Sequence, residues 1–435
     1  MWVFNDFSLA LLLAGAMVVL WIFEWIPVYL TALLPLLLAV PLGLLTPKDL
    51  AQCYGDSNIF LFFGGFVMAL ALEKWAVHEQ IARRIIAVVG DKKSNILLGF
   101  ILSTGLISMW ISNTATALMM LPMAVAVVEA MPPAHRNSKF SIFLMLSIAY
   151  ASNIGGVGTL IGSPPNTQMA SILSESFNIE ISFFDWMKIG MPLAIILLLL
   201  MFLIFNYLLG AERKDVHDLH FHTLPWTKAQ KRVLWIFSIV AGLWIFREAI
   251  GTYLGLNYRD ENAAILGALA MFLMPSGAAP KEKVLRWSDT EKLPWGILLL
   301  FGGGLALAAV LEKNGVLQFL AATFESFHGM SLLTAIVILT TLAIFISEVL
   351  SNLAMVTLFI PVVGIFAHQT GLPLVPLAMA LTLGASLAFM MPVGTPPNAI
   401  VFGSGYLRIK DMIRYGFILN IISLVLIILF VILFL

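Results

Sequence analysis

The sequence predicts an all-α polytopic membrane protein, and three observations carry this prediction. Of its 435 residues, 60% are apolar and 11% are charged, whereas soluble globular proteins average about 45–50% and about 25%. Apolar runs recur along the chain, and a helix needs roughly 20 residues to cross the hydrocarbon of a bilayer. Short motifs also recur at a fixed spacing, as in many secondary transporters. We therefore expect a multi-pass protein of the plasma membrane, or of the inner membrane in a bacterium.

The charges and the cysteine count exclude several kinds of partner. Lys and Arg number 24, as do Asp and Glu, so no global positive field is available to hold nucleic acid. The single cysteine, Cys53, excludes an intramolecular disulfide and a cysteine-rich metal site. The segment Met1–Asp6 contains no Lys or Arg, and a secretory signal needs a basic start. We therefore interpret the first apolar run as a retained helix.

The apolar runs, each taken to end at a charged residue, Gly or Pro, predict about ten spanning helices and two helical hairpins. The first half gives Phe7–Trp25, Pro27–Leu45, Asn58–Leu72, Ser94–Ile111 with Ala115–Met131, Phe140–Gly162 and Trp186–Leu209. The second half gives Val233–Gly251, Asn262–Met274, Pro294–Leu311, Ser331–Leu350 with Ala354–His368, Pro373–Val393 and Tyr415–Leu435. Each joined pair is interrupted by a few residues around a Ser-Asn dipeptide, which indicates a re-entrant hairpin. Its tip must line a cavity or be buried in protein, because irregular backbone is otherwise too costly at membrane depth.

Four motifs occur twice in the same order, which predicts an internal repeat. Phe62–Gly65 and Phe301–Gly304, Ser112-Asn113 and Ser351-Asn352, and Pro122 and Pro361 are each 239 positions apart, while Gly162–Asn166 and Gly394–Asn398 are 232 apart. The repeat divides the chain into 1–210, a cytoplasmic linker at 211–230, and 231–435. The hairpin tips are at 112–114 and 351–353, and the helix breaks at 162–166 and 394–398. Five crossings in each half invert the second half relative to the first.

The distribution of positive charge predicts the orientation in the membrane. Lys and Arg collect in cytoplasmic loops. With both termini outside and both hairpins re-entrant, every Lys and Arg falls on an inside loop except Lys48, Lys188, Arg247, Arg259 and Lys313. A full crossing at either hairpin would remove this asymmetry.

Polar residues at the hairpin tips and helix breaks form a candidate anion site. Two successive prolines remove backbone donors and clash with the preceding turn, so each helix is expected to break there. Hairpin tips and broken helices direct helix N-termini at one point, where their partial positive charge favours an anion. The short polar residues expected there are Ser112, Asn113, Thr114, Ser163, Ser351, Asn352 and Thr395. Carbonyls freed by the breaks are suited to sodium, and bound cations are expected to balance the anion.

These motifs resemble those of the divalent anion:sodium symporters, a family of sodium-coupled dicarboxylate, citrate and sulfate carriers. The resemblance covers almost the whole chain and depends on Ser112-Asn113-Thr114, the altered Ser351-Asn352-Leu353, Ser163–Asn166 and Thr395–Asn398. The family usually has an additional N-terminal helix. The resemblance implies a secondary transporter that takes up a divalent anion with sodium. It also implies a homodimer in which hairpins and broken helices move as an elevator against a fixed scaffold.

The resemblance further implies two or more sodium ions. One site would use Ser108, Ser112, Asn113 and Gly162, and its counterpart Ser347, Leu350, Asn352 and Gly394, several of them through backbone oxygen. Independently of the family, Ser108 and Ser347 each precede their tip serine by four residues, so each hydroxyl faces its tip across one helical turn. Neither set contains a Lys or Arg that would replace sodium in an exchanger, which favours symport.

The second hairpin departs from the family pattern in one position that bears on the substrate. We expect a C4-dicarboxylate such as succinate, with Leu353 and Pro396 completing the substrate-binding set. Because Leu353 replaces a threonine hydroxyl, citrate and sulfate are alternatives, and anion exchange is a further one. Glu348 is the one acid deep in a hairpin helix, opposite Met109 in the first half. Intramembrane carboxylates are functional candidates, so Glu348 either pairs structurally with a backbone donor or tunes the second cation site.

An intramembrane enzyme and a channel are the alternative classes of protein. An intramembrane enzyme would need a His-Glu-x-x-His motif, an acidic dyad or a serine with a base, and the predicted spans contain none of these. We therefore do not expect an enzyme. A channel is the remaining rival, which saturable sodium-dependent uptake would exclude.

Overall fold

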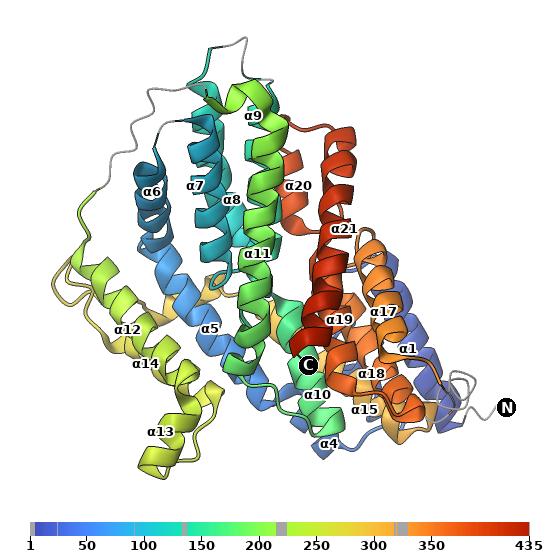
Figure 1. The fold of residues 1–435 in the computed structure, drawn as a ribbon. Coiled ribbons are helices and arrows are strands. Elements are labelled where there is room, and N and C mark those ends of the chain that lie inside the picture. The colour runs from blue at the N-terminus through green and yellow to red at the C-terminus, as the bar shows by residue number, and fades with distance from the viewer. Residues whose placement is uncertain are drawn as a thin grey trace.

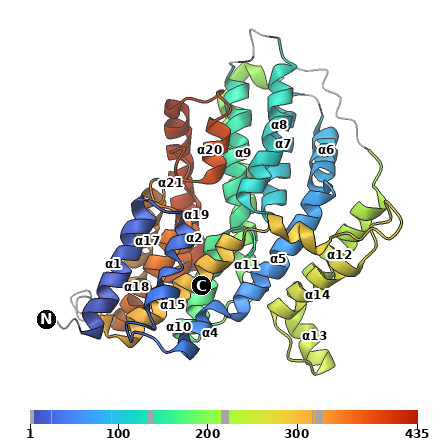
Figure 2. The same cartoon turned by 180° about the vertical axis from the view of Figure 1, so that it is seen from behind.

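The fold is built from helices, as Figures 1 and 2 show from opposite sides. A computed structural model describes residues 5–23, 25–90, 92–132, 136, 138–214, 224–316, 319 and 329–434. No β-strand occurs among these residues, and an isolated bridge pairs Pro275 with Lys283. The all-α fold class is confirmed. Part of the predicted linker 211–230, namely 215–223, lies outside the described residues.

The helices alternate between long apolar rods and short segments. In the first half they are α1 (Asp6–Phe23), α2 (Val28–Thr31), α3 (Leu34–Leu38), α4 (Pro47–Tyr54), α5 (Ser57–Lys74), α6 (Val77–Val89), α7 (Lys93–Ser108), α8 (Asn113–Glu129), α9 (Lys139–Val157), α10 (Pro164–Phe177) and α11 (Phe183–Leu209), followed by the 3₁₀ turn η2 (Gly210–Lys214). In the second half they are α12 (Lys228–Ile245), α13 (Arg247–Leu254), α14 (Asp260–Leu273), the 3₁₀ turn η3 (Trp287–Lys292), α15 (Trp295–Lys313), α17 (Leu332–Ile346), α18 (Asn352–Thr370), α19 (Leu374–Ser386), α20 (Pro396–Phe402) and α21 (Ile409–Phe434).

Two predicted spans are not single helices. Pro27–Leu45 is divided into α2 and α3, because Pro27 caps α2 and Pro35 lies in the first turn of α3, where proline starts helices rather than continuing them. Val233–Gly251 is divided into α12 and α13, which meet at an angle of 77°. At that bend the Trp244 indole donates to the Asp260 carbonyl oxygen at 3.0 Å, and Arg247 reaches the Asp260 carboxylate at 3.4 Å. These contacts fix the turn without a proline.

Helix length alone identifies fewer spans than the apolar runs predict. Among the described residues, six helices are long and apolar enough to cross a membrane: Pro47–Lys74, Lys139–Val157, Phe183–Glu212, Trp295–Lys313, Asn352–Thr370 and Ile409–Phe434. One of these, Asn352–Thr370, is an arm of the second predicted hairpin. The other expected crossings consist of shorter or broken helices, so the number of about ten stays a prediction.

The packing of the two halves is reciprocal. α7 packs on α9 in the first half, as α17 packs on α19 in the second. The short helix α10 packs against α18, and the short helix α20 packs against α8. Each half therefore places the second part of its broken helix against the hairpin of the other half. In both views α7, α8 and α20 lie in the upper part of the molecule and α10, α18 and α19 in the lower part. This arrangement supports an inverted repeat.

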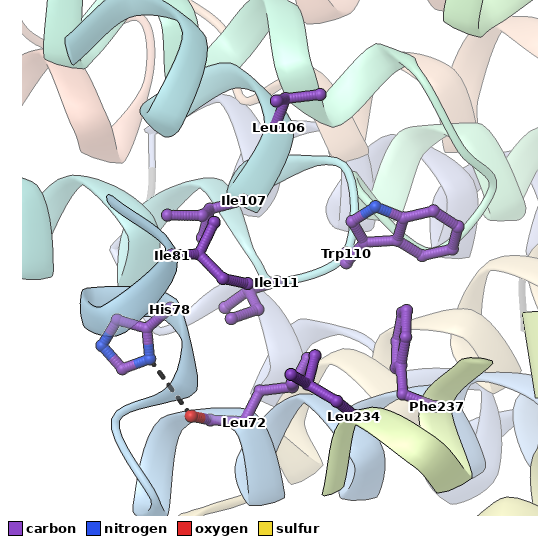
Figure 3. A pocket seen from close by; sticks show the side chains of 9 residues that line it. All are labelled: Leu72, His78, Ile81, Leu106, Ile107, Trp110, Ile111, Leu234 and Phe237. Carbon is purple, nitrogen blue, oxygen red and sulfur yellow. Dashed lines mark hydrogen bonds between the residues drawn. The ribbon is translucent and has the colours of Figure 1, made fainter. Parts of the chain in front are cut away.

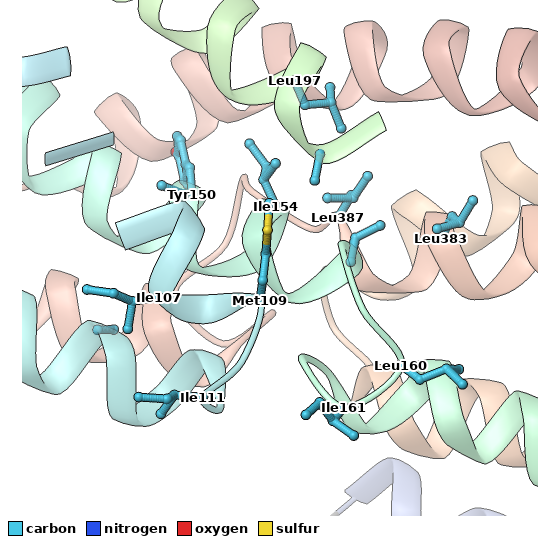
Figure 4. Packing of buried hydrophobic residues seen from close by; sticks show 14 of the residues in the cluster. Ile107, Met109, Ile111, Tyr150, Ile154, Leu160, Ile161, Leu197, Leu383 and Leu387 are labelled. Carbon is cyan, nitrogen blue, oxygen red and sulfur yellow. The ribbon is translucent and has the colours of Figure 1, made fainter. Parts of the chain in front are cut away.

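α9 runs through the centre of the molecule. Every residue from Phe140 to Val157 except Ile142 is buried, and Figure 4 shows Tyr150 and Ile154 of this helix packed with Met109 of the first hairpin. Two glycines make this packing possible, because a Cβ at Gly155 would collide with the Gly105 carbonyl and a Cβ at Gly156 with the Asn113 amide. α9 therefore fixes where the first hairpin tip lies.

Candidate ion and anion site

The first hairpin tip is closed by short polar side chains. Ser112 caps α8, because its hydroxyl oxygen accepts the Ala115 N–H at 3.3 Å. Ser108, the last residue of α7, donates from its hydroxyl to the Ser152 carbonyl oxygen at 2.8 Å. This bond attaches the tip to α9. Ser112, Asn113 and Thr114 are each partly accessible, as a ligand site at a hairpin tip requires.

One end of the Asn113 amide lies in a cluster of oxygen atoms. That end is 2.9 Å from the Ser108 hydroxyl oxygen and 3.1 Å from each of the carbonyl oxygens of Ser152 and Gly162. If the amide oxygen occupies this end, four oxygens face one another and a cation among them would relieve their repulsion. If the amide nitrogen occupies it, the nitrogen can donate to the same three atoms. The cluster contains three of the four residues predicted for the first sodium site, and Ser152 is an addition.

The first helix break begins earlier than the two prolines predict. α9 already ends at Val157, and Pro164 and Pro165 form the first turn of α10. The prediction of a break at 162–166 is therefore wrong in its starting point, because proline is favoured at the start of a helix, where its missing N–H is no loss. The Asn166 amide donates to the carbonyl oxygens of Gly156 at 2.9 Å and Thr159 at 2.8 Å. Asn166 thus satisfies carbonyls that the broken helix leaves free.

The second break repeats this design. α19 ends at Ser386, and Pro396 and Pro397 begin α20. The Asn398 amide donates to the carbonyl oxygens of Ala388 at 3.2 Å and Met391 at 3.0 Å, as Asn166 does in the first half. This break also starts before the predicted 394–398, for the same reason.

The second hairpin tip has unsatisfied polar groups. Ser351 begins α18 without a side-chain cap bond, and the Asn352 amide oxygen is buried without a partner in the described part of the chain. Buried amide oxygens are normally hydrogen-bonded, so Asn352 is available to a ligand. The predicted ligand Ser347 instead donates to the Ile344 carbonyl oxygen at 2.9 Å. Leu350 is buried nearby in the same turn.

The remaining predicted site residues differ in accessibility. Ser163, Thr395 and Gly394 are buried, whereas Pro396 is exposed. Thr395 caps α20, since its hydroxyl oxygen accepts the Asn398 N–H at 3.3 Å. Leu353 is partly buried and packs against apolar side chains. No hydrogen bond among the described residues joins the two tips directly.

Asn153 was missed in the sequence and connects the two halves. Its amide nitrogen, on α9, lies 2.9 Å from the Thr395 hydroxyl oxygen and 3.3 Å from the Asn398 amide oxygen. The Asn153 amide oxygen is buried and has no partner in the described residues. An isolated asparagine in the apolar run Phe140–Gly162 was the available signal, because polar residues inside spans are rare and functional.

Glu348 is held in the second tip by several donors. Its carboxylate oxygens accept the N–H groups of Phe389, Met390 and Met391 at 2.9–3.0 Å. The Asn420 amide of α21 donates to Oε1 at 2.7 Å. The interpretation of Glu348 as a partner of backbone donors is therefore confirmed.

A separate cavity beside the first tip has a different chemistry. It measures about 190 Å³ and is lined mainly by apolar side chains, including Leu106, Trp110 and Phe237. Figure 3 shows these residues with His78, whose Nδ1 lies 3.2 Å from the Leu72 carbonyl oxygen. An anion would find almost no donors there, so we do not assign the anion to this cavity.

Hairpins and broken helices that meet inside a helical membrane protein define the class of secondary transporters. The sequence model of the citrate transporter family matches residues 18–384. The chain therefore belongs to the citrate transporter family and is a membrane transporter, not an enzyme.

Similar proteins agree with this assignment. The chain is 37% identical to the sodium-dependent dicarboxylate transporter SdcS of Staphylococcus saprophyticus, covering 94% of this chain and 83% of the relative. It is 39% identical to the same-named transporter of Staphylococcus aureus strain USA300, covering 94% and 82%. Two solved structures share the fold at low identity. The Alcanivorax borkumensis YdaH transporter has a TM-score of 0.58, 13% identity and coverage of 98% and 97%. Neisseria gonorrhoeae MtrF has a TM-score of 0.64, 11% identity and coverage of 100% and 95%.

Proposed function

We propose that this protein takes up a C4-dicarboxylate such as succinate together with sodium. The oxygen cluster around Asn113 is the observation that carries the proposal: the Ser108 hydroxyl and the Ser152 and Gly162 carbonyl oxygens all lie 2.9–3.1 Å from one end of the Asn113 amide. Neutral oxygens of this kind are ligands for a hard cation. The relatives named sodium-dependent dicarboxylate transporters support both the ion and the substrate class. The helix starts at Asn113 and Asn352 supply N–H groups that an anion requires, whereas α10 and α20 each begin with two prolines, which have no N–H.

Two sodium sites fit the repeat. The first would comprise Ser108, Ser112, Asn113 and Gly162, and the Ser152 carbonyl oxygen beside them supports a fifth ligand. The second comprises Ser347, Leu350, Asn352 and Gly394 at the other tip. The anion would lie between the tips and contact Ser112, Asn113, Thr114, Ser163, Ser351, Asn352, Leu353, Thr395 and Pro396. Neither ligand set contains a Lys or Arg, so bound sodium would balance the charge of the dianion.

Transport would follow an elevator motion in a homodimer. The hairpins, α9, α10, α19 and α20 form one interlocked unit, since each short helix packs against the opposite hairpin. Such a unit can move as a whole while α12, α13 and α14 stay at the periphery, where both views place them. We propose that the two halves, 1–210 and 231–435, are inverted repeats with both termini outside.

Uptake into proteoliposomes tests the function directly. Purified protein is reconstituted, and radiolabelled succinate, citrate and sulfate are supplied with an inward sodium gradient or with choline in its place. We expect saturable succinate uptake that requires sodium. Equal uptake in choline would contradict sodium coupling, and flux that does not saturate would indicate a channel.

Citrate is the second candidate substrate. The family that matches the chain is described as a citrate transporter family, and Leu353 lacks the hydroxyl that Thr114 offers in the first tip. Unlabelled citrate competing with labelled succinate decides between them. A lower half-inhibitory concentration for citrate than for succinate itself would make citrate the preferred substrate. Preloading the vesicles with anion and removing the sodium gradient separates exchange from symport.

The proposed orientation is tested by labelling single cysteines. In a Cys53→Ser background, a cysteine placed in the Glu175–Ile181 segment is expected to react with a membrane-impermeant maleimide from outside. A cysteine in the Asp215–Thr223 segment is expected to react only after the cell is opened. The reverse pattern would contradict termini that lie outside.

A further inference from the structure

A groove of about 360 Å³ lies where α5 ends, α12 begins and the chain leaves α14. It is lined by residues 74–76, residues 227–230, Gly277 and Ala278, and we call it the basic groove. The three helices pack on one another, and Figures 1 and 2 show them side by side. α5 and α12 belong to stretches that are apolar enough to cross a membrane, and both stretches stop at the groove. The basic groove therefore lies at the level of the lipid headgroups.

Two lysines line the basic groove, and they differ in their partners. Lys74 is paired with the Asp289 carboxylate at 2.7 Å. Lys228, in the first turn of α12, is exposed and takes part in no ion pair within the described part of the chain. The charge of Lys228 is therefore available to an anion that enters the groove.

An arginine borders the groove because a glycine lets it approach. Gly277 has a φ of +75°, and a Cβ there would lie 3.0 Å from the Arg232 guanidinium and 3.2 Å from the Lys228 Cβ. Arg232 donates to the Pro275 carbonyl oxygen at 2.6 Å, which holds the guanidinium at the edge of the groove. The acid of this connection, Glu282, accepts a serine hydroxyl at 2.9 Å. The groove thus combines two lysines and an arginine in one hollow.

The same face of α12 becomes apolar farther into the membrane. Lys228, Arg232, Trp235 and Ile239 follow one another at spacings of four, three and four residues, which places them on one face of the helix. Trp235 is 60% exposed and Ile239 is 40% exposed. A bilayer supplies acyl chains to such side chains. One helix face therefore carries positive charge at headgroup level and exposed apolar surface below it.

This order of charge and apolar surface matches an anionic phospholipid. Basic pockets between membrane helices bind lipid phosphates, and tryptophan, here Trp75 in the groove wall, is enriched at headgroup level. A free anion would use the charges but would leave Trp235 and Ile239 without a role. The proposed orientation places the groove at the cytoplasmic leaflet, where anionic lipids attract basic residues.

We propose that the basic groove binds the phosphate of an anionic phospholipid, with an acyl chain along the α12 face that carries Trp235 and Ile239. The headgroup then contacts Trp75 and Ala76, which join α5 to α6. This inference goes beyond the proposed function, because binding of the lipid needs neither sodium nor a dicarboxylate.

Thermal unfolding of the full-length protein in a neutral detergent tests the proposal. A ligand that binds the folded state raises its stability. Phosphatidylglycerol, phosphatidylcholine and inorganic phosphate are titrated separately at constant ionic strength, without sodium or succinate. We expect saturable stabilisation by phosphatidylglycerol alone. Equal stabilisation by phosphatidylcholine would overturn the preference for an anionic lipid. Saturable stabilisation by inorganic phosphate that weakens in Lys228→Gln would make the occupant a free anion and overturn the lipid assignment.

Lys228→Gln tests whether the groove itself holds the lipid. We expect the fraction of phosphatidylglycerol at half-maximal stabilisation to rise roughly fivefold, as for loss of one basic residue near an anionic surface. Lys410→Gln is the matched control, because Lys410 is also exposed in the first turn of an apolar helix, α21, but does not line the groove. Equal shifts in the two variants would reduce the effect to general surface charge and overturn the site.

A second pair of variants adds charge instead of removing it. Ala278 is exposed in the wall of the groove, so both replacements are expected to fold. Ala278→Glu places a carboxylate beside the lipid phosphate and is expected to weaken binding more than Ala278→Gln, which has the same size without the charge. Equal midpoints in these two variants would contradict a phosphate in the groove. Because these assays contain no transport substrate, a failure of sodium-coupled uptake leaves their outcome unchanged.

Discussion

The two hairpin tips occupy equivalent positions in the chain but are attached to their helix breaks by different groups. In the first half a threonine hydroxyl connects the Met109 carbonyl to Gly162. In the second half the Glu348 carboxylate takes N–H groups from three residues of the break. The asparagines that close the breaks, Asn166 and Asn398, are alike. The two breaks are thus closed by similar backbone contacts but differ in charge, so equivalent substitutions at the two tips are not expected to have equal effects.

The largest expected effect comes from the two tip asparagines. Asn113→Ala removes the amide at the centre of the oxygen cluster, and we expect succinate uptake to fall by about 100-fold or more at fixed sodium, as for loss of a buried ion ligand. For Asn352→Ala we expect a smaller fall in succinate uptake, because the Glu348 carboxylate at the second tip still attracts sodium. Asn314→Ala is the matched control, since that amide bonds only the Leu44 and Val310 carbonyls. Normal sodium-dependent uptake in both tip variants would refute the site.

The second largest effect is expected at Thr159, whose neutral hydroxyl links the first hairpin tip to its helix break. Thr159→Val leaves the Met109 carbonyl and the Gly162 N–H without their partner, and we expect the free energy of unfolding to fall by about 1–3 kcal/mol. The sodium concentration at half-maximal succinate uptake should shift less than in Glu348→Gln, because no charge is removed. Thr341→Val, whose hydroxyl bonds a carbonyl of its own helix, is expected to stay within about 0.5 kcal/mol. Equal sodium shifts in Thr159→Val and Glu348→Gln would show that both links are merely structural.

Asn153 sharpens the comparison because it has no counterpart across the repeat. Asn153→Ala removes the bond from α9 to Thr395 in the second break. We expect apparent succinate affinity to weaken about three- to tenfold, since a hydrogen bond between polar groups contributes about 0.5–1.5 kcal/mol. Ser147→Ala on the same helix, whose hydroxyl bonds the Leu144 carbonyl, serves as the control. The half-saturation constants for succinate, measured at saturating sodium, decide the matter. Identical values for Asn153→Ala and the control would exclude Asn153 from the site.

The smallest effect concerns Leu353. Leu353→Thr restores the hydroxyl that Thr114 carries in the first tip, and we expect a several-fold shift of preference toward a four-carbon dicarboxylate. Leu353 also packs against apolar neighbours, so the variant can weaken the hairpin. Competition assays distinguish the two, because packing damage weakens all substrates alike. An unchanged order among succinate, citrate and sulfate would remove Leu353 from the anion site.

The sequence located the tips and the breaks to within a few residues, but not the start of each break. The Ser-Asn pairs and the Pro-Pro-Asn motifs indicate where helices are interrupted, because Ser, Asn and Pro act on the backbone within a few residues of themselves. The expected start at the prolines was wrong because proline begins α10 and α20, while Asn166 and Asn398 satisfy carbonyls released further upstream. Glu348 was recognised as a candidate from its depth alone, and the choice among its partners required the fold.

Composition and apolar run length determined by themselves that this is an all-helical membrane protein, and the resemblance of its motifs to a known family indicated a transporter. These features are local or additive along the chain, so no tertiary information is needed to read them. Only the tertiary structure decided that Asn153 reaches Thr395, that Asn420 holds Glu348, and that α10 and α20 pack against the opposite hairpins. Such partners are distant in sequence. Their approach depends on how whole helices pack, which no local pattern of residues encodes.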